Sequence, residues 1–215
     1  MEPVLVLAID SATPTVVAGV VDSDTDEVLG ETILENCRDH NEQLVPATQA
    51  ALNKAGKTFQ DIHAIVVGTG PGPFTGLRVG MATAAAFGDA LGIPVHGVCS
   101  LDAIAVQIPA EQKVVAIDAR RREAYWARYE GERVGEPQVT PYDQVPRVGE
   151  MNAPANLAEH FPEATHDLYP TPLALVQVAS LGEQPGPLQP LYLRRPDAKE
   201  PKPKPKSPAI PDVQL

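Results

Sequence analysis

An apolar run at residues 62–68 limits the folds that this chain can adopt. The run, from Ile62 to Gly68, is typical of a strand that lies centrally in a sheet and is covered on both faces. A loop rich in glycine and proline follows at residues 69–73, and an alanine-rich helix is then expected from about Thr75 to Leu91, ended by Gly92. With another strand expected at residues 94–98, this order predicts an α/β protein whose mixed sheets are flanked by helices.

Three runs with a β-type pattern precede this unit. Turn-rich segments separate them, so we expect an antiparallel meander at residues 4–9, 15–21 and 27–34. After Asn41 the apolar positions recur at helical spacing, and Gly56 is the expected end of that helix. The first half is therefore predicted to run β-β-β-α-β-α-β.

A second half begins near Lys113, because residues 114–118 repeat the pattern of residues 6–10. An alternating run follows a short turn in each copy, as a duplicated, two-lobed fold requires. In the second copy the alternation places Ala124, Trp126 and Arg128 on one face, opposite Tyr125 and Tyr129.

The remaining chain predicts shorter elements and a tail. Short strands and helices are expected at residues 139–148, 153–161 and 173–181. We therefore divide the chain into a first lobe at 1–108, a smaller second lobe at 109–195, and a tail at 196–215. The tail contains six prolines among its lysines and is expected to be disordered, since such a segment cannot bury a core.

The charge balance argues against a broad surface that grips nucleic acid. Seventeen Lys and Arg stand against 28 Asp and Glu, which gives a formal net charge of −11, so any RNA would have to be held by another protein. Only two cysteines occur, and no segment has the pattern of a signal peptide or a membrane span. A reduced, cytoplasmic protein with no membrane contact is expected.

The loop after the central strand is the most specific motif. A strand, a glycine-rich loop and a helix start aim backbone N–H groups at an anion, and the helix dipole adds to the attraction. Leu77 and Arg78 follow Gly76 where a Walker loop needs Lys and then Ser or Thr, and Thr75 occupies the third-glycine position of a Rossmann fingerprint. A loop that only turns the chain is the alternative.

Residues 70–80, Gly-Pro-Gly-Pro-Phe-Thr-Gly-Leu-Arg-Val-Gly, resemble the signature of the TsaB (YeaZ) family, which usually has Ser where this chain has Pro73. Matching segments occur in the same order at 8–13, 40–44 and 190–194, so the resemblance covers about residues 4–195. It implies an actin and Hsp70-like (ASKHA) fold of two lobes, with the second lobe shortened.

The resemblance also implies a function and partners. Such proteins work beside a larger paralogue, TsaD, which holds the metal and transfers a threonylcarbamoyl group to the tRNA adenosine next to the anticodon, while the small ATPase TsaE completes the machinery. This chain is then expected to be a scaffold that is not an enzyme by itself, forms a homodimer when alone and reaches tRNA through the complex. It needs no cofactor of its own, and ATP or ADP is a candidate ligand at the joint with TsaD.

By the same resemblance, Asp10 occupies the place where an ASKHA enzyme presents a carboxylate to nucleotide-bound magnesium. The alternative is that Asp10 caps the turn through Thr13. The residues of this weakly indicated nucleotide or anion loop are Asp10, Ser11, Gly70, Gly72 and Thr75.

No metal site is predicted, because no two histidines lie one helical turn apart, and His40 is expected to be a surface or capping residue. The alternative function is a self-sufficient ASKHA-type kinase that uses Asp10 and the loop at 70–75 on ATP. The lack of a second glycine-rich loop after residue 118 favours the scaffold.

Small residues form a stripe along the second helix, so another element could pack closely against its backbone. That element is either a helix of a partner or the chain's own sheet. The resemblance places the partner surface on the first two long helices. The residues predicted to contribute are Leu44, Thr48, Ala51, Leu52, Ala55, Leu77, Gly80, Ala84 and Gly88.

Overall fold

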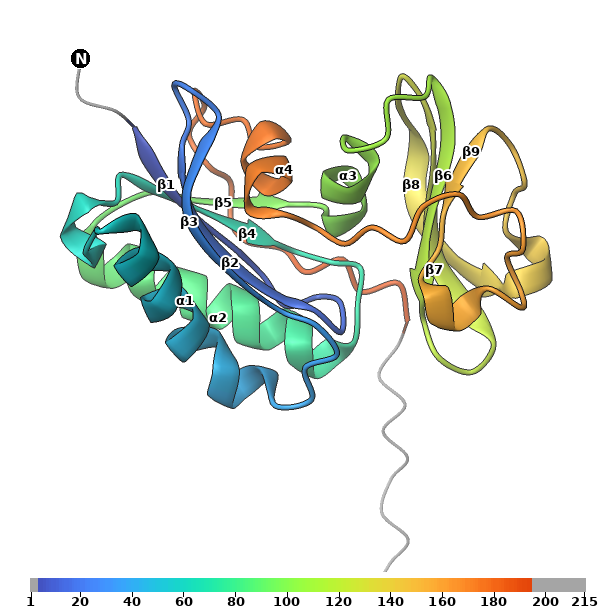
Figure 1. Cartoon of the computed structure of the whole chain (residues 1–215), viewed down its shortest axis with the longest axis horizontal. Helices are drawn as coiled ribbons and strands as arrows, with labels where there is room; N and C mark the ends of the chain where they lie inside the picture. The colour runs from blue at the N-terminus through green and yellow to red at the C-terminus, as the bar shows by residue number, and fades with distance from the viewer. Residues whose placement is uncertain (1–3, 195–215) are drawn as a thin grey trace, which may run out of the picture.

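The computed structural model describes residues 4–194, which form two sheets side by side with helices packed around the first (Figure 1). The first sheet has the strand order β3-β2-β1-β4-β5. Its first three strands form an antiparallel meander, and β4 and β5 add in parallel to β1. This confirms the predicted meander and the buried strand beside it. The strands are β1 (Leu5–Asp10), β2 (Val16–Asp22), β3 (Glu27–Leu34), β4 (Ala64–Gly68) and β5 (Val95–Val98).

Two long helices, α1 (His40–Ala55) and α2 (Phe74–Leu91), cover one face of this sheet (Figure 1). Each ends at a glycine in the left-handed conformation, Gly56 at φ 64° and Gly92 at φ 68°, where a side chain would be strained. Both predicted ends are confirmed. Pro46 lies inside α1.

The opposite face of the sheet is covered by a segment from late in the chain. Helix α4 (Pro172–Gln177) packs on β1 and β2, and Leu175 is fully buried there. The short helix α3 (Ser100–Ala105) contacts both α4 and β6. The division at residues 108 and 109 stays a prediction, but α4, from the second range, contributes to the core of the first sheet.

The second sheet has the order β8-β7-β6-β9. The two faces of β7 alternate as predicted, because Ala124 and Trp126 belong to one apolar cluster and Tyr125 and Tyr129 to another. Strand β8 begins earlier than the expected run at 139–148, and a 3₁₀ turn (Tyr142–Gln144) follows it directly. The strands are β6 (Gln112–Asp118), β7 (Glu123–Glu130), β8 (Glu132–Pro141) and β9 (Glu150–Asn152).

Two further 3₁₀ turns complete the fold, at Phe59–Asp61 and Ala155–Leu157. Within residues 4–194, no helix combines the length and apolar character needed to cross a membrane. The tail predicted at 196–215 lies outside the described residues.

Candidate functional site between the lobes

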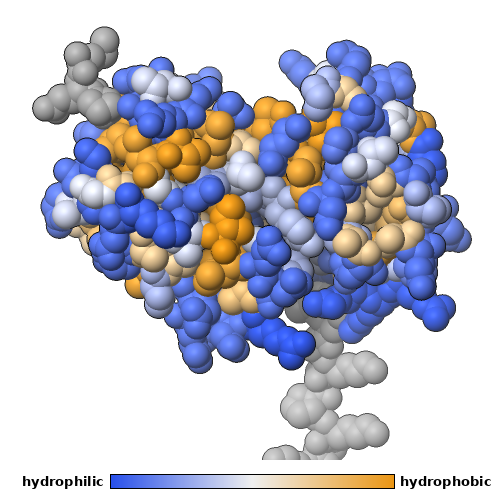
Figure 2. Space-filling view, in the orientation of Figure 1, coloured by the Kyte–Doolittle hydropathy of each residue, from blue (hydrophilic) through white to orange (hydrophobic). Residues whose placement is uncertain are grey.

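Two equivalent turns, one from each sheet, meet where the lobes adjoin. The turn after β1 and the turn after β6 line a shared cavity of about 380 Å³, and a second of about 510 Å³ adjoins it. Both cavities include Pro73 of the glycine loop and Arg120 of the second lobe. On the face drawn in Figure 2 the surface is hollowed between the lobes. This interlobe cleft contains the sequence motifs singled out above.

Asp10, at the end of β1, is fully buried beside the cleft. Ser100 Oγ donates to its Oδ2 at 2.5 Å, and the backbone N–H of Ala12 donates to its Oδ1 at 2.8 Å. Burial raises the pKa of this carboxyl to about 6, because desolvation disfavours the charge more than these hydrogen bonds favour it. The interpretation that Asp10 caps the turn matches its contact with Ala12.

The glycine loop packs directly on the turn after β1. A Cβ on Gly72 would lie 1.9 Å from Ala12 O, and a Cβ on Gly68 would lie 1.7 Å from Asp10 Oδ2. Ser11 Oγ donates to Gly76 O at 2.8 Å. These glycines are needed for close approach of the chain to itself, whatever the loop binds. Gly70 has φ 94°, and its carbonyl accepts from Ser100 N at 2.8 Å.

Thr75 is the predicted loop residue that reaches the open part of the cleft. It is exposed and lines the 510 Å³ cavity with His40. His40 Nε2 donates to Thr13 O at 2.9 Å, so this histidine fastens the start of α1 to the turn after β1.

The residues at this end of β1 do not fit nucleotide-bound magnesium. Such a metal needs carboxylate oxygens that are open to it, whereas the Asp10 side chain has no exposed surface and is held by hydrogen bonds inside the protein. Within residues 4–194 no group of three or more His, Cys, Asp or Glu side chains is placed to hold a metal ion.

The residues predicted to touch a partner lie mostly in the chain's own core. Apart from Ala55, which is half-buried, all of them are buried. A Cβ on Gly80 would lie 2.5 Å from Ser11 Oγ, and one on Gly88 would lie 2.3 Å from Val95 Cγ2. The stripe therefore faces the first lobe itself, and contact of these residues with a partner stays a prediction. Regular helical spacing of apolar residues identified the core face of each helix. The buried residues are Leu44, Thr48, Ala51, Leu52, Leu77, Gly80, Ala84 and Gly88.

The outer face of α2 is formed by different residues. Ala82, Ala86 and Ala90 are exposed and recur every four positions, and no charged residue occurs between Arg78 and Asp89. On α1, Val45 is an exposed apolar residue. This uncharged surface could have been read from the sequence as the stripe opposite the core.

The turn after β6 contains three arginines that belong to none of the predicted motifs. Arg120, Arg121 and Arg122 have φ values of 62°, 57° and 61°, a conformation that is uncommon for residues other than glycine. All three are exposed. Arg194 Nη1 donates to Ala119 O at 2.8 Å. The run of three arginines after a strand-ending aspartate was the signal available in the sequence.

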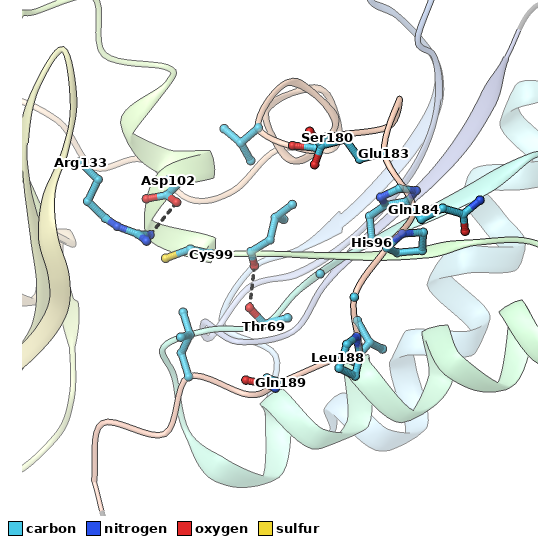
Figure 3. A pocket seen from close by; sticks show the side chains of 17 residues that line it. Thr69, His96, Cys99, Asp102, Arg133, Ser180, Glu183, Gln184, Leu188 and Gln189 are labelled. Carbon is cyan, nitrogen blue, oxygen red and sulfur yellow. Dashed lines mark hydrogen bonds and ion pairs between the residues drawn. The ribbon is translucent and has the colours of Figure 1, made fainter.

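A third cavity, of about 440 Å³, lies between β5, α3 and the segment at 178–191 (Figure 3). Arg133 and Asp102 form an ion pair at 2.7 Å in its wall, and Tyr129 Oη donates to Asp102 at 2.8 Å. Burial raises the pKa of the Cys99 thiol to about 11 and lowers that of His96. Both groups are therefore neutral near pH 7, and neither is an activated nucleophile or a cation.

Comparison with known proteins agrees with this architecture. A family model described as "TsaD: tRNA N6-adenosine threonylcarbamoyltransferase" matches residues 3–182. An uncharacterized protein of Mycobacterium tuberculosis is 51% identical over 90% of this chain and 93% of its own length. The TsaB protein of Escherichia coli is 33% identical over 60% of this chain and 57% of its own length.

A solved structure extends the comparison to the fold. YeaZ from Pseudomonas aeruginosa has a TM-score of 0.68 and 25% identity, with 81% of this chain and 90% of that chain covered. The two-lobed ASKHA-type fold is thereby confirmed. The chain belongs to the family that the TsaD model describes, and within it is a protein of the TsaB (YeaZ) type.

Proposed function

We propose that this chain is a non-catalytic subunit that binds and supports a TsaD-type transferase in the formation of threonylcarbamoyladenosine in tRNA. Its relatives in Escherichia coli and Bacillus subtilis are named tRNA threonylcarbamoyladenosine biosynthesis protein TsaB. The matching family model is named for the transferase of the same modification. A paralogue that keeps the fold and has lost the reacting groups would act through its surface.

The observation that carries this proposal is the state of Asp10. A phosphotransferase of this fold would need that carboxylate to be open to the cleft, and here it has no exposed surface and is held by Ser100 and Ala12. The same observation disfavours the kinase alternative. A calorimetric titration with Mg-ATP separates the two, because tight binding with turnover would favour the kinase.

The outer faces of α1 and α2 are the proposed contact surface for TsaD. Because Ala82, Ala86 and Ala90 are small, exposed and uncharged, the backbone of another helix could approach closely there. In the absence of TsaD the same surface would form a homodimer. This chain would contact TsaE and tRNA only as part of the assembled complex. Any ATP or ADP would bind at the joint with TsaD, and the complex would work in the cytoplasm.

Complex formation is the test of this proposal. The purified chain is mixed with TsaD from the same organism and followed by size-exclusion chromatography with light scattering. A stable complex of the two chains is expected. Two chains that elute separately at micromolar concentration, with or without tRNA and nucleotide, would contradict the proposal.

A further inference from the structure

Arginines gather at the mouth of the interlobe cleft although the chain as a whole is acidic. Arg120, Arg121 and Arg194 line one cavity of about 300 Å³ there, and Arg38 and Arg120 line the neighbouring one. Arg122 is exposed beside them. Within the cavity-lining residues only one carboxylate, that of Asp118, occurs. The whole chain has a net charge of −11, so this cluster of arginines is a local exception.

The arginines elsewhere in residues 4–194 have a different setting. Arg128, Arg133 and Arg147 each form an ion pair with a carboxylate, of Glu130, Asp102 and Glu163 respectively. At the mouth, Arg38 and Arg122 have no carboxylate within 4.0 Å among the described residues. Arg194 does pair with Glu123, and Arg120 pairs with Asp118 at 3.6 Å, yet 73% of the Arg120 side chain is exposed.

Hydrogen bonds hold the turn that presents these side chains in an unfavourable conformation. Left-handed backbone is unfavourable for residues other than glycine, and three successive arginines adopt it. Arg120 N donates to Asp118 Oδ1 at 2.7 Å, and Tyr142 N donates to Arg122 O at 3.2 Å. Arg194 donates to the carbonyls of Ala119 and Arg120. Strain that is maintained in this way is typical of functional segments.

Two exposed aromatic rings border the same cavity. Phe74 and Tyr192 are 45% and 44% exposed, and their ring centroids lie 5.1 Å apart in a stacked arrangement. The guanidinium of Arg78 lies 5.1 Å from the centroid of the Phe74 ring. Flat, exposed rings beside guanidinium groups form a surface on which unpaired bases stack.

Together, these groups match the chemistry of a single-stranded nucleic acid. Guanidinium groups bind phosphates in bidentate pairs, and aromatic faces accept bases of any sequence. An acidic peptide would engage the arginines but would bring no flat bases to the exposed rings. The acidic remainder of the surface would repel phosphates and so confine contact to this mouth.

We propose that the arginine rim, defined as Arg78 and Arg120 to Arg122 with Phe74 and Tyr192, binds a single-stranded segment of RNA directly. Only the choice of RNA over DNA rests on the proposed function. The rim therefore departs from the expectation that RNA is reached solely through other subunits, and it adds a local contact to the complex.

The test measures binding of a fluorescein-labelled RNA hairpin with an unpaired loop to the full chain by fluorescence anisotropy. Arg120→Asn combined with Arg122→Asn removes two rim charges, and asparagine tolerates the left-handed backbone. The matched control is Lys54→Asn combined with Lys57→Asn, which removes the same charge at the far end of α1. Arg78→Gln, on the exposed side of α2, is a second rim variant that does not depend on the turn.

The rim variants are expected to weaken binding about tenfold at about 50 mM salt, and the double variant should lower the slope of log affinity against log salt by about 1.4, the value for two lost contacts with a single strand. The control should stay within about twofold of the parent chain. Phe74→Ala should also weaken binding, by about fivefold or more.

Three results would overturn the inference: no binding by the parent chain at this salt concentration, equal loss in rim and control variants, or displacement of the RNA by polyglutamate at equal charge concentration. Measuring TsaD binding with the same variants separates the inference from the proposed function. A chain that fails to bind TsaD but still binds RNA through the rim would contradict only the proposed function.

Discussion

Ser100 donates a hydrogen bond to Asp10 across 2.5 Å, and the two residues are 90 positions apart in the chain. The contact joins the first residue of α3 to the end of β1 and keeps the carboxylate inside the protein. It lies at the place where a phosphotransferase of this fold would need a carboxylate that is accessible from the cleft.

The first prediction concerns the pH dependence of stability. The pKa of Asp10 is raised from 3.8 to about 6 by burial, so the folded state holds this proton more tightly than the unfolded state. The contribution of Asp10 to the free energy of unfolding should therefore be highest below about pH 4 and fall as the pH rises through 6. The loss is on the order of 3 kcal/mol at about 1.4 kcal/mol per pKa unit.

Comparison with Asp10→Asn isolates this carboxyl from the others. Asparagine can still accept from Ala12 and keep a contact with Ser100, but it has no charge to bury. Urea unfolding should find the variant more stable than the parent at pH 7.5, with a gap that closes near pH 4. A gap of the same size at both pH values would show that the titration of Asp10 is not the cause.

The second prediction concerns the glycines of α2. A Cβ on Gly76 would lie 2.5 Å from the backbone oxygen of Ser11, so Gly76→Ala must push the helix away from the turn. It should lower the free energy of unfolding by about 1–3 kcal/mol, although alanine favours a helix by about 1 kcal/mol over glycine. Gly182→Ala, with nothing within 4 Å, serves as the control in the same chemical denaturation series. Gly80→Leu should likewise disturb folding and not partner contact alone.

The third prediction concerns Arg194, which fastens the end of the described chain to the turn after β6. Arg194→Ala removes donors to the carbonyls of Ala119 and Arg120 and an ion pair with Glu123. Hydrogen exchange of the amides at 119–123 should accelerate, and stability should fall by about 1–3 kcal/mol. Arg128→Ala, in a more exposed pair with Glu130, should cost less than about 1 kcal/mol. Unchanged exchange in the turn would count against this role of Arg194.

The fourth prediction concerns the outer face of α2. Ala86→Glu places a charge in the middle of an exposed, uncharged stripe, so it should weaken the complex with TsaD at least about tenfold while the chain stays folded. Val134→Glu, at an exposed apolar position on β8, makes the same chemical change away from this surface. Equal binding by both variants in isothermal titration would place the partner elsewhere.

Local patterns in the sequence were sufficient to predict most of the first lobe. The apolar run that became β4 and the glycines that end α1 and α2 act through short-range geometry, which a sequence displays directly. The start of β8 was missed, since Gly135 and Pro137 interrupt its pattern. The short element expected at residues 153–161 is a 3₁₀ turn at Ala155–Leu157.

The site was harder to predict because its contacts join distant segments. Nothing near Asp10 in the sequence indicates that Ser100 closes over it, or that residues 190–194 return to the turn after β6. Helical spacing did find the stripe from Gly76 to Gly88, but the period is the same for a core face and for a partner face. Only the tertiary packing distinguishes them.

Reconstituted modification of tRNA tests the central claim most directly. Unmodified tRNA, ATP and a threonylcarbamoyl donor are incubated with TsaD and TsaE, with this chain alone, or with all three. Threonylcarbamoyladenosine is then measured by mass spectrometry. We predict that the product forms only when TsaD and this chain are both present, and that the Asp10→Asn chain supports the same rate as the parent. Product formed by this chain alone, or a folded Asp10→Asn chain that supports no product, would contradict the account.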